Sequence, residues 1–328
     1  MPRLKISVAI AVYNSSRYMK EQLDSITAQT RLPDEVVFCD DCSSDNTVEL
    51  LENWKRTVPF EVNIFRNPHN LGCTKNFSQA LEKCSGDAVI VSDCDDVWLE
   101  HRVEKCAGLF ESDENLGLIT GNARLIDGEG VFQNMLLDEY LTKMHVREFW
   151  RFFYPLDSPM TVWTGCTMAV RKSVLNQILP VPPQLACHDI WIFLLAPLAG
   201  KILYLDEPLI EYRLHGKNYS TAPTVSQLRS APPQWRYFNT VIETLGTHPQ
   251  LIESLIQRAE NFAESQAFIR RLKNQKRHFE NRAAIEKNAF SGVGKFLREL
   301  GCGGYFQHPQ PIMSILYDIL VGTGIKHG

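Results

Sequence analysis

The segment AVIVSDCDDVWLEHR, residues 88–102, joins a strongly apolar run to a cluster of carboxylates. Its first four residues, 88–91, are all hydrophobic, which is typical of a strand buried on both faces of a parallel sheet. Asp93, Asp95 and Asp96 follow directly. Like charges packed this closely raise one another's pKa unless a positive group lies among them. The segment therefore predicts carboxylates that either spread into solvent at a strand end or surround a cation.

The alternation of apolar strand, polar turn and helix recurs throughout the residues that precede this segment. The expected strands cover residues 5–12, 34–41, 60–67 and 87–93, and the expected helices cover 17–29, 43–54 and 73–84. This rhythm indicates βαβ units, and hence an α/β fold with a mostly parallel central sheet and flanking helices. Ligands of such sheets bind beyond the carboxyl ends of the strands. Three polar groups are expected to meet there: Tyr13-Asn14, Asp40-Asp41 and residues 93–96.

The second half of the chain is less regular. Residues 164–175 predict a strand and then a helix, residues 186–200 a helix, and residues 201–215 one or two strands. Prolines, serines and threonines concentrate in a stretch that reads as a linker, and apolar residues at helical spacing follow it. The sequence thus predicts one domain over residues 1–222 and a helical C-terminal region over residues 223–328.

The 328 residues carry a net charge of −4 and are 44% hydrophobic, which allows a substantial core and gives no indication of nucleic-acid binding. The charge is uneven, because residues 270–299 contain nine lysines and arginines but three glutamates. This basic stretch predicts either contact with an anionic membrane surface or a solvated helix face. No apolar run reaches the roughly 20 residues of a membrane span.

The nine cysteines are odd in number and scattered, so a disulfide framework is not expected. The spacing of CDDC at residues 39–42 fits a redox pair or half of a zinc site, but no second such motif exists. The N-terminus leads directly into a strand without a recognisable signal peptide. We expect a reduced, cytoplasmic protein, peripheral at the inner face of the cell membrane if the basic stretch binds lipid.

Several motifs carry a resemblance to a known family. In the first half these are AVYN at 11–14, CDDCSSDNT at 39–47, NLGCTKNFSQAL at 70–81 and SDCDDVW at 92–98. Together they resemble the nucleotide-sugar half of the family 2 glycosyltransferases, which have the Rossmann-like GT-A fold. The last motif is similar to the bacterial subgroup that builds O-antigen and capsule chains, many of whose members are rhamnosyltransferases. Counterparts in the second half are TGCTMAV at 164–170, HDIW at 188–191 and EPLIEYRLHGKNYS at 207–220.

The resemblance implies a nucleotide-sugar-binding half at residues 1–110 and an acceptor-binding half at 111–222. It implies an inverting, metal-dependent hexosyl- or deoxyhexosyltransferase that uses a UDP- or dTDP-linked donor. The acceptor would be a glycan, such as an undecaprenyl-diphosphate-linked O-antigen or capsule precursor. Two alternatives stay open, a nucleotidyltransferase of similar fold and a non-catalytic sugar-binding module. The first would need a glycine-rich basic loop after the first strand, which residues 12–20 lack.

The resemblance also assigns the residues that bind the donor: Ala11, Tyr13, Asn14, Asp41, Asn76, Asp93 and Arg213. Tyr13 is expected to stack on the base. Asp41 would accept a hydrogen bond from a pyrimidine ring N–H, which cytosine lacks. The alternatives are turn hydrogen bonds between Asp40 or Asp41 and the serines that follow, and an ordinary helix-surface amide for Asn76.

Asp95, Asp93 and His215 are the implied ligands of Mn²⁺ or Mg²⁺, and hard divalent cations prefer such carboxylate oxygens. Cys94 stands where the subgroup usually has glutamine, but this middle position is variable. The alternative is that Asp95 and Asp96 cap a helix beginning near Leu99.

Asp189 is the implied general base, which would take the proton of the acceptor hydroxyl. Its alternative role is the N-cap of a helix over residues 190–199. His188, Trp163 and Trp191 are the expected acceptor contacts, although core packing is an equally ordinary role for tryptophan. Arg213 and His215 resemble a loop that closes over the diphosphate.

Overall fold

The structure is a computed structural model that describes residues 3–143, 164–183, 185, 187–216, 218, 225–226 and 249–287. These residues fall into two compact units. Unit 1 contains the described residues up to 226, and unit 2 contains residues 249–287. The expected domain boundary at residues 222–223 lies outside the described residues and stays a prediction.

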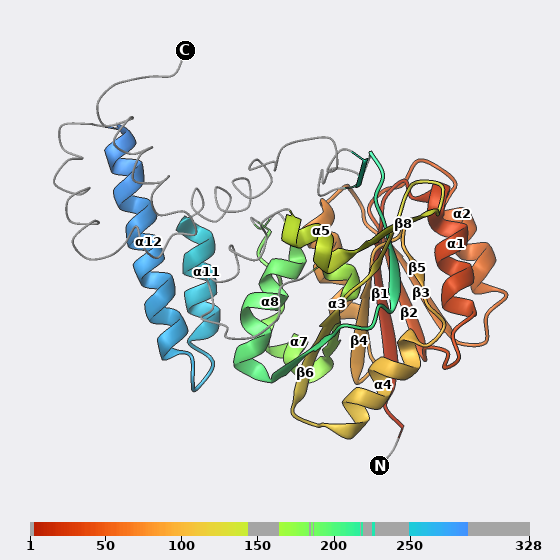
Figure 1. Ribbon diagram of the computed structural model, residues 1–328, viewed down its shortest axis with the longest axis horizontal. Helices are drawn as coiled ribbons and strands as arrows, with labels where there is room; N and C mark the ends of the chain where they lie inside the picture. The colour runs from red at the N-terminus through yellow and green to blue at the C-terminus, as the bar shows by residue number, and fades with distance from the viewer. Residues whose placement is uncertain are drawn as a thin grey trace. The chain divides into compact units, whose positions relative to one another are not determined.

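Unit 1 is built on a seven-stranded sheet with the strand order β10-β6-β9-β4-β1-β2-β3 (Figure 1). Its strands are β1 (Ile6–Val12), β2 (Glu35–Asp40), β3 (Glu61–Arg66), β4 (Ala88–Ser92), β6 (Leu116–Gly121), β9 (Ala169–Arg171) and β10 (Lys201–Leu205). All neighbouring pairs are parallel except that β9 runs antiparallel between β4 and β6. The predicted mostly parallel sheet is therefore confirmed.

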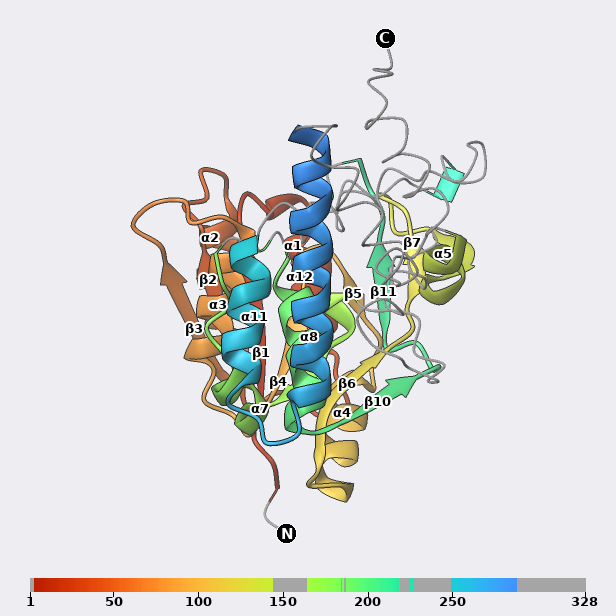
Figure 2. The same cartoon turned by 90° about the vertical axis from the view of Figure 1, so that its left-hand side faces the viewer.

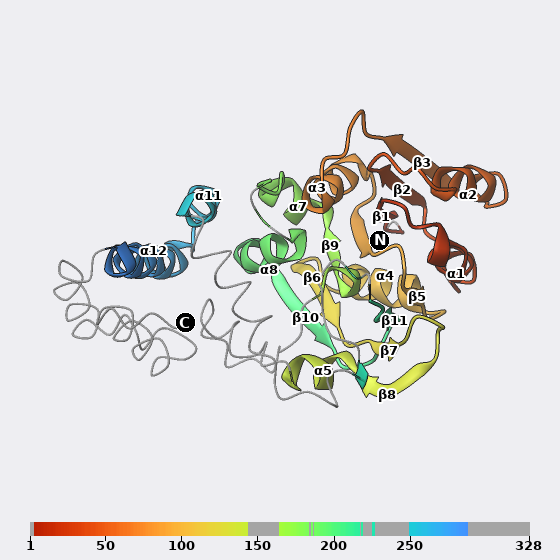
Figure 3. The same ribbon diagram turned by 90° about the horizontal axis from the view of Figure 1, so that it is seen from above.

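The central strands β1, β2 and β4 are buried along their whole length, which explains their mostly apolar sequences. Helices cover both faces of the sheet, with α1 and α2 on one face and α3, α7 and α8 on the other (Figure 3). The helices of unit 1 are α1 (Ser16–Thr27), α2 (Thr47–Lys55), α3 (Cys73–Lys83), α4 (Arg102–Ser112), α5 (Leu137–Lys143), α7 (Lys172–Ile178) and α8 (His188–Ala199). A short 3-10 turn, η1 (Gly165–Thr167), precedes β9.

A second, four-stranded sheet has the order β5-β11-β7-β8 and consists of β5 (Val97–Trp98), β11 (Ile210–Arg213), β7 (Arg124–Ile126) and β8 (Phe132–Leu136). In β5, Trp98 pairs with Ile210 of β11, so the chain is extended directly after the acid cluster. Helix α4 begins only at Arg102, with His101 at its N-cap. The expectation that Asp95 and Asp96 cap this helix is therefore wrong, because a strand separates them from its first turn.

Unit 2 is a pair of helices, α11 (Pro249–Ala259) and α12 (Gln266–Lys287), that lie side by side (Figure 2). Apolar side chains of both helices are buried, among them Leu255 on α11 and Leu272 on α12. An ion pair of 2.6 Å joins Lys276 to Glu253. The predicted helical C-terminal portion is thus present, and none of the helices described in either unit is long and apolar enough to cross a membrane.

Candidate active site

The loops that follow β1, β2 and β4 meet at one edge of the large sheet. Asn14 adopts a left-handed backbone conformation with φ 50°. Its backbone N–H donates to Ser43 Oγ at 2.9 Å, and its Oδ1 accepts from the Ser44 N–H at 2.8 Å. Ser15 Oγ lies 3.0 Å from Cys94 Sγ in the acidic loop. The three polar groups therefore converge where the strand topology predicted.

Asp45 connects two of these loops, although no motif in the sequence predicted a role for it. Its Oδ2 accepts from the Ser16 N–H at 3.1 Å and its Oδ1 from the Thr47 N–H at 3.0 Å, so it serves the first residues of α1 and α2. Burial raises its pKa, but hydrogen bonds from Thr47 and Ser16 outweigh that effect and lower the pKa to about 2. Ser15 occupies the N-cap position of α1 without making a side-chain capping bond.

Asp41 lies 3% exposed and organises the loop that leads into α3. Its Oδ1 accepts from Asn67 Nδ2 and from the Leu71 N–H, each at 2.8 Å, and its Oδ2 accepts from the Gly72 N–H at 2.9 Å. Gly72, at the N-cap of α3, has φ 83°, a conformation that favours glycine. Of the two aspartates expected to make a turn hydrogen bond to a serine, Asp40 makes one, because it accepts from the Ser43 N–H at 3.2 Å.

Three other predicted donor-binding residues differ widely in exposure. Tyr13 is 54% exposed, so its ring is open to a base. Ala11, near the end of β1, is buried, with 8% of its surface exposed. Asn76 is only 2% exposed, donates to Cys39 O at 2.8 Å and accepts from Asn67 Nδ2 at 2.9 Å. It is therefore neither a helix-surface amide nor a side chain open to a ligand. Its buried amide connects α3 to β2 and to the loop at Asn67.

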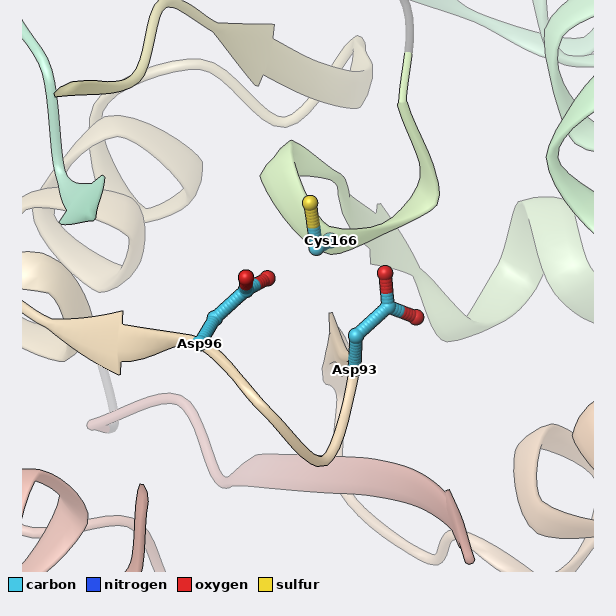
Figure 4. Close-up of side chains that lie close together, drawn as sticks. All are labelled: Asp93, Asp96 and Cys166. Atoms are coloured by element: carbon cyan, nitrogen blue, oxygen red, sulfur yellow. The ribbon is translucent and has the colours of Figure 1, made fainter. Parts of the chain in front are cut away.

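The acidic loop turns two of its carboxylates toward Cys166 of η1 (Figure 4). One ligand atom each of Asp93, Asp96 and Cys166 lies within 4.8 Å of the other two. Asp96 is 1% exposed, its Oδ1 accepts from the Arg213 N–H at 2.9 Å, and its Oδ2 has no hydrogen-bond partner among the described residues. Asp93 and Asp96 thus form an inner group, while Asp95 is turned elsewhere.

A buried positive group lies near the inner carboxylates, but its effect on their pKa is smaller than that of burial and of the neighbouring acids. Burial, followed by the charges of Asp96 and Asp95, raises the pKa of Asp93 well above its usual range. Burial and the charge of Asp95 raise the pKa of Asp96 to about 7. The buried guanidinium of Arg102 acts in the opposite direction on both. Sequence reasoning missed this residue because one arginine at the start of an amphipathic helix is ordinary.

Asp95 faces His215, with 3.0 Å between Oδ2 and Nε2. Their side chains are 21% and 13% exposed, and the imidazole stacks on Tyr18 at a ring-centroid distance of 4.9 Å. Arg213, the predicted diphosphate contact, is fully buried; it donates to Asp95 O at 2.7 Å and to Glu21 Oε2 at 2.6 Å. Two of the three predicted metal ligands, Asp95 and His215, are therefore in contact. Arg213 stabilises the acidic loop through its hydrogen bond to Asp95 O.

Asp189 lies in the first turn of α8, whose N-cap position belongs to Cys187. Its Oδ1 accepts from the Ile190 N–H at 2.8 Å and its Oδ2 from the Gly165 N–H at 3.2 Å. Burial raises its pKa despite these hydrogen bonds, and its charge contributes to the raised pKa of Asp93. The expected base and the acid cluster therefore lie close enough to interact.

The predicted acceptor contacts lie mostly in the interior. His188 is 5% exposed and stacks on Phe77 at 3.8 Å between ring centroids, and burial lowers its pKa to about 3, so the ring is neutral. Trp191 is 1% exposed and donates to Ile178 O at 2.6 Å. Trp163 lies outside the described residues. In this structure His188 and Trp191 pack in the core.

The sequence is similar to several glycosyltransferases. An uncharacterized glycosyltransferase of Nostoc sp. is 29% identical over 243 residues, which cover 70% of this chain and 71% of that protein. The dTDP-rhamnosyl transferase RfbG of Shigella flexneri is 23% identical over 229 residues, covering 64% and 72%. The crystal structure of S. aureus TarS 1–349 in complex with UDP-GlcNAc shares the fold, with a TM-score of 0.51, 20% identity, and coverage of 84% and 86%.

The sequence profile of the family described as Glycosyl transferase family 2 matches residues 7–179. This range contains the large sheet up to β9 and the loops after β1, β2 and β4. It also contains the acid cluster and ends directly after α7. Because the match takes in more than half of the chain, we conclude that the protein belongs to glycosyl transferase family 2 and is a glycosyltransferase with the GT-A fold.

Proposed function

We propose that the enzyme transfers a sugar, with inversion and with the help of a divalent cation, from a UDP- or dTDP-linked donor to a glycan. The observation that carries the proposal is the acidic loop after β4. In this loop Asp95 lies beside His215, and the carboxylate of Asp93 receives no hydrogen bond from the described residues. Asp189 of α8 lies close enough to Asp93 to raise its pKa. Family membership favours this transfer over the nucleotidyltransferase and the non-catalytic module.

The residues at the loop fit a divalent cation. A carboxylate oxygen of Asp95 and an imidazole nitrogen of His215 lie side by side and remain accessible, and both are ordinary ligands of Mn²⁺. The inner group suits a cation less, because Cys166 is completely buried and Arg102 already places a positive charge there. Asp95 and His215 would hold the ion, which would stabilise negative charge on the departing diphosphate.

Asp189 has the properties of a general base. Burial raises its pKa toward the working range, which makes it a better proton acceptor than an ordinary aspartate. The N–H groups of Ile190 and Gly165 fix the carboxylate, so its orientation is set before the acceptor arrives. Removal of the acceptor's proton by this single carboxylate gives one displacement, and therefore inversion at the anomeric carbon.

The donor and acceptor classes rest on similarity as well as on the site. RfbG is named a dTDP-rhamnosyl transferase and TarS binds UDP-GlcNAc, so both relatives use pyrimidine nucleotides. We propose the same donor class here, and as acceptor a lipid-linked O-antigen or capsule precursor. Such an acceptor would hold the enzyme at the cytoplasmic face of the membrane.

The substitution Asp189→Asn tests the proposal. Asparagine keeps the volume of aspartate and, with its single side-chain oxygen, can accept one of the two hydrogen bonds that Ile190 and Gly165 donate. It cannot take a proton at working pH. We expect turnover to fall on the order of 10²–10⁴-fold, the usual contribution of a general base. The Kd of the donor should change only a few-fold, because the base acts on the acceptor.

Asp34→Asn is the matched control. Asp34 also accepts a backbone hydrogen bond, from the Ile6 N–H at 2.9 Å, but it directly precedes β2, at the opposite end of the strands from the loops of the site. Its variant should turn over at the wild-type rate. Nearly full turnover by Asp189→Asn would assign the base to another residue, and wild-type enzyme that releases sugar from none of the UDP- or dTDP-sugars would contradict the donor class.

A further inference from the structure

Arg102 is a charged side chain in an unusual position. It is 1% exposed, and burying a guanidinium costs several kcal/mol unless other groups compensate it. We infer that Arg102 is a positioning residue: it holds the acidic loop and the turn η1, which contacts Asp189, in fixed positions relative to each other. Arg102 thereby affects the rate of sugar transfer and not the affinity for the donor. The inference rests on the proposed function, since it assigns Asp189 as the base.

The contacts of Arg102 join three segments that are distant in sequence. Arg102 opens α4, and its Nη2 donates to Val91 O on β4 at 3.0 Å and to Cys166 O in η1 at 2.5 Å. The guanidinium lies 4.2 Å from the ring centroid of Trp98, which fixes its plane. Val91 stands two residues before Asp93, so one end of the bridge lies at the base of the acidic loop.

The other end of the bridge leads to Asp189. Gly165, the neighbour of Cys166, donates its N–H to Asp189 Oδ2 at 3.2 Å. There is little free space at this turn, because a Cβ added to Gly165 would lie 2.6 Å from His188 Nε2. A shift of η1 would therefore move the donor that orients Asp189, or force α8 to move with it. Arg102 is a side chain that ties this turn to β4, in addition to the backbone bond from the Val91 N–H to Met168 O.

The charge of Arg102 also contributes to holding the acidic loop in position. Its guanidinium lies close enough to Asp93 and Asp96 to interact favourably with both carboxylates. Its Nη1 has no hydrogen-bond partner among the described residues, so the arginine is not fully satisfied by backbone carbonyls alone. A residue that only filled space would not need this charge. The charge has a role if Arg102 also interacts with the inner carboxylates.

Arg171 provides a matched control. It also donates to several backbone carbonyls, at 2.8 Å to Leu116 O and Phe110 O and at 3.0 Å to Asp113 O. Its guanidinium also lies over an aromatic ring, that of Phe110, at 5.1 Å. These contacts fix the far end of α4 and do not reach the acidic loop. Arg171→Met therefore removes a structural arginine of the same kind without touching η1.

The experiment compares the full-length wild type with Arg102→Lys, Arg102→Met and Arg171→Met. For each protein it measures the melting temperature, the Kd of UDP by calorimetry, and kcat and KM for transfer. We expect Arg102→Met to lower kcat roughly ten- to a hundredfold, the usual cost of misplaced reacting groups, with the Kd of UDP unchanged within about threefold. Arg102→Lys keeps the charge and one carbonyl contact and should recover part of kcat. Arg171→Met should melt earlier but keep kcat.

The outcomes separate the inference from the proposed function. A kcat for Arg102→Met near that of the wild type, or an equal loss of kcat in Arg171→Met, would overturn the inference while leaving the function intact. If Arg102→Met does not fold, Arg102→Lys decides alone: a lowered kcat at an unchanged melting temperature supports the inference, and an unchanged kcat overturns it. A wild type inactive with every nucleotide sugar contradicts the proposed function instead.

Discussion

At the scale of single residues, the three carboxylates of the acidic loop differ by environment rather than by type. Asp95 is partly exposed and meets His215, whereas Asp96 is buried and held by the backbone of Arg213. Asp93 stands between these environments, turned toward Cys166. A cation from solvent therefore has access to Asp95, while the inner pair depends on Arg102 for its positive partner.

Asp95→Ala should abolish cation-dependent turnover and leave the fold intact, because Asp95 is the accessible carboxylate beside His215. Turnover is to be measured with Mn²⁺, with Mg²⁺ and with EDTA, and the fold by circular dichroism. Asp113→Ala, which removes an exposed carboxylate paired with Lys201, is the control and should behave as wild type. A variant at position 95 with wild-type turnover in EDTA would refute the cation assignment.

Asp96 should make the metal-free protein less stable as the pH rises. Its pKa is raised to about 7 in the folded protein, above the value of an unfolded chain, so the folded state binds the proton more tightly. The resulting stability is complete below about pH 4 and is lost as the pH rises through about 7. Asp96→Asn keeps the acceptor for the Arg213 N–H. At pH 8 in EDTA its free energy of unfolding should exceed that of the wild type by on the order of 1 kcal/mol, and it should melt at a higher temperature.

The measurement for Asp96 is thermal unfolding in EDTA between pH 5 and pH 8, on wild type and variant. The difference in stability between the two proteins should grow with pH over this range. A constant difference would show that the ionisation of Asp96 does not contribute. Asp34→Asn, whose carboxylate accepts a backbone hydrogen bond elsewhere, controls for general effects of charge removal.

The identity of the acidic residues was predictable from the sequence, but their supports were not. Asp-x-Asp after an apolar run predicts the site because polar side chains at a strand end must face a ligand or solvent. Arg102 and Asp45 carry no such signal, since an arginine in a helix and an aspartate in a turn are ordinary surface residues. Only the tertiary structure shows that both connect segments that are separate in the sequence.

At the scale of elements, the buried central strands were predictable, whereas the two-residue strand β5 was not. β1, β2 and β4 have long β-branched runs that fit no other structure, and their bounds agree with the expected ones within one or two residues. β5 consists of two residues and exists because Trp98 pairs with Ile210, which lies more than a hundred positions away. Local sequence favoured a helix beginning near Leu99, and this distant pairing delays it to Arg102.

The basic face of α12 should bind anionic membranes. Arg270, Lys273 and Arg277 are exposed and recur at a spacing that places them on one side of the helix. Each basic residue near an anionic surface contributes up to about 1 kcal/mol. Replacing all three with glutamine in the full-length protein should therefore reduce flotation with phosphatidylglycerol vesicles at low salt, and high salt should release the wild type.

A triple variant on unit 1 controls for net charge. Lys20, Lys55 and Arg56 are exposed, and their replacement with glutamine removes the same charge from helices α1 and α2 and the residue that follows α2. This variant should float like the wild type. If both triple variants float equally, the basic residues of α12 form a solvated helix face, which is the alternative that the sequence left open.

At the scale of the whole molecule, the sheet topology determines where chemistry is possible. β4, β1 and β2 are parallel neighbours, so the loops that follow them share one edge even though up to about eighty residues separate them. The sequence predicted this convergence because the rule depends only on strand order and direction. It did not predict which side chains would remain open, since Asn76 and Arg213 are covered by loops that only the folded chain brings together.

The base of the donor should be uracil or thymine, because Tyr13 and Asp41 lie at the ends of adjacent strands at this edge. Tyr13 offers an exposed ring for stacking. The carboxylate of Asp41 already accepts three hydrogen bonds from its own loop, and since a carboxylate has about four acceptor sites, one remains for a ring N–H. UDP and dTDP should inhibit transfer at least roughly tenfold better than CDP or GDP, the effect of about 1.4 kcal/mol. Tyr13→Ala should weaken all four nucleotides alike, whereas equal inhibition of the wild type by UDP, CDP and GDP would exclude Asp41 as the residue that selects the base.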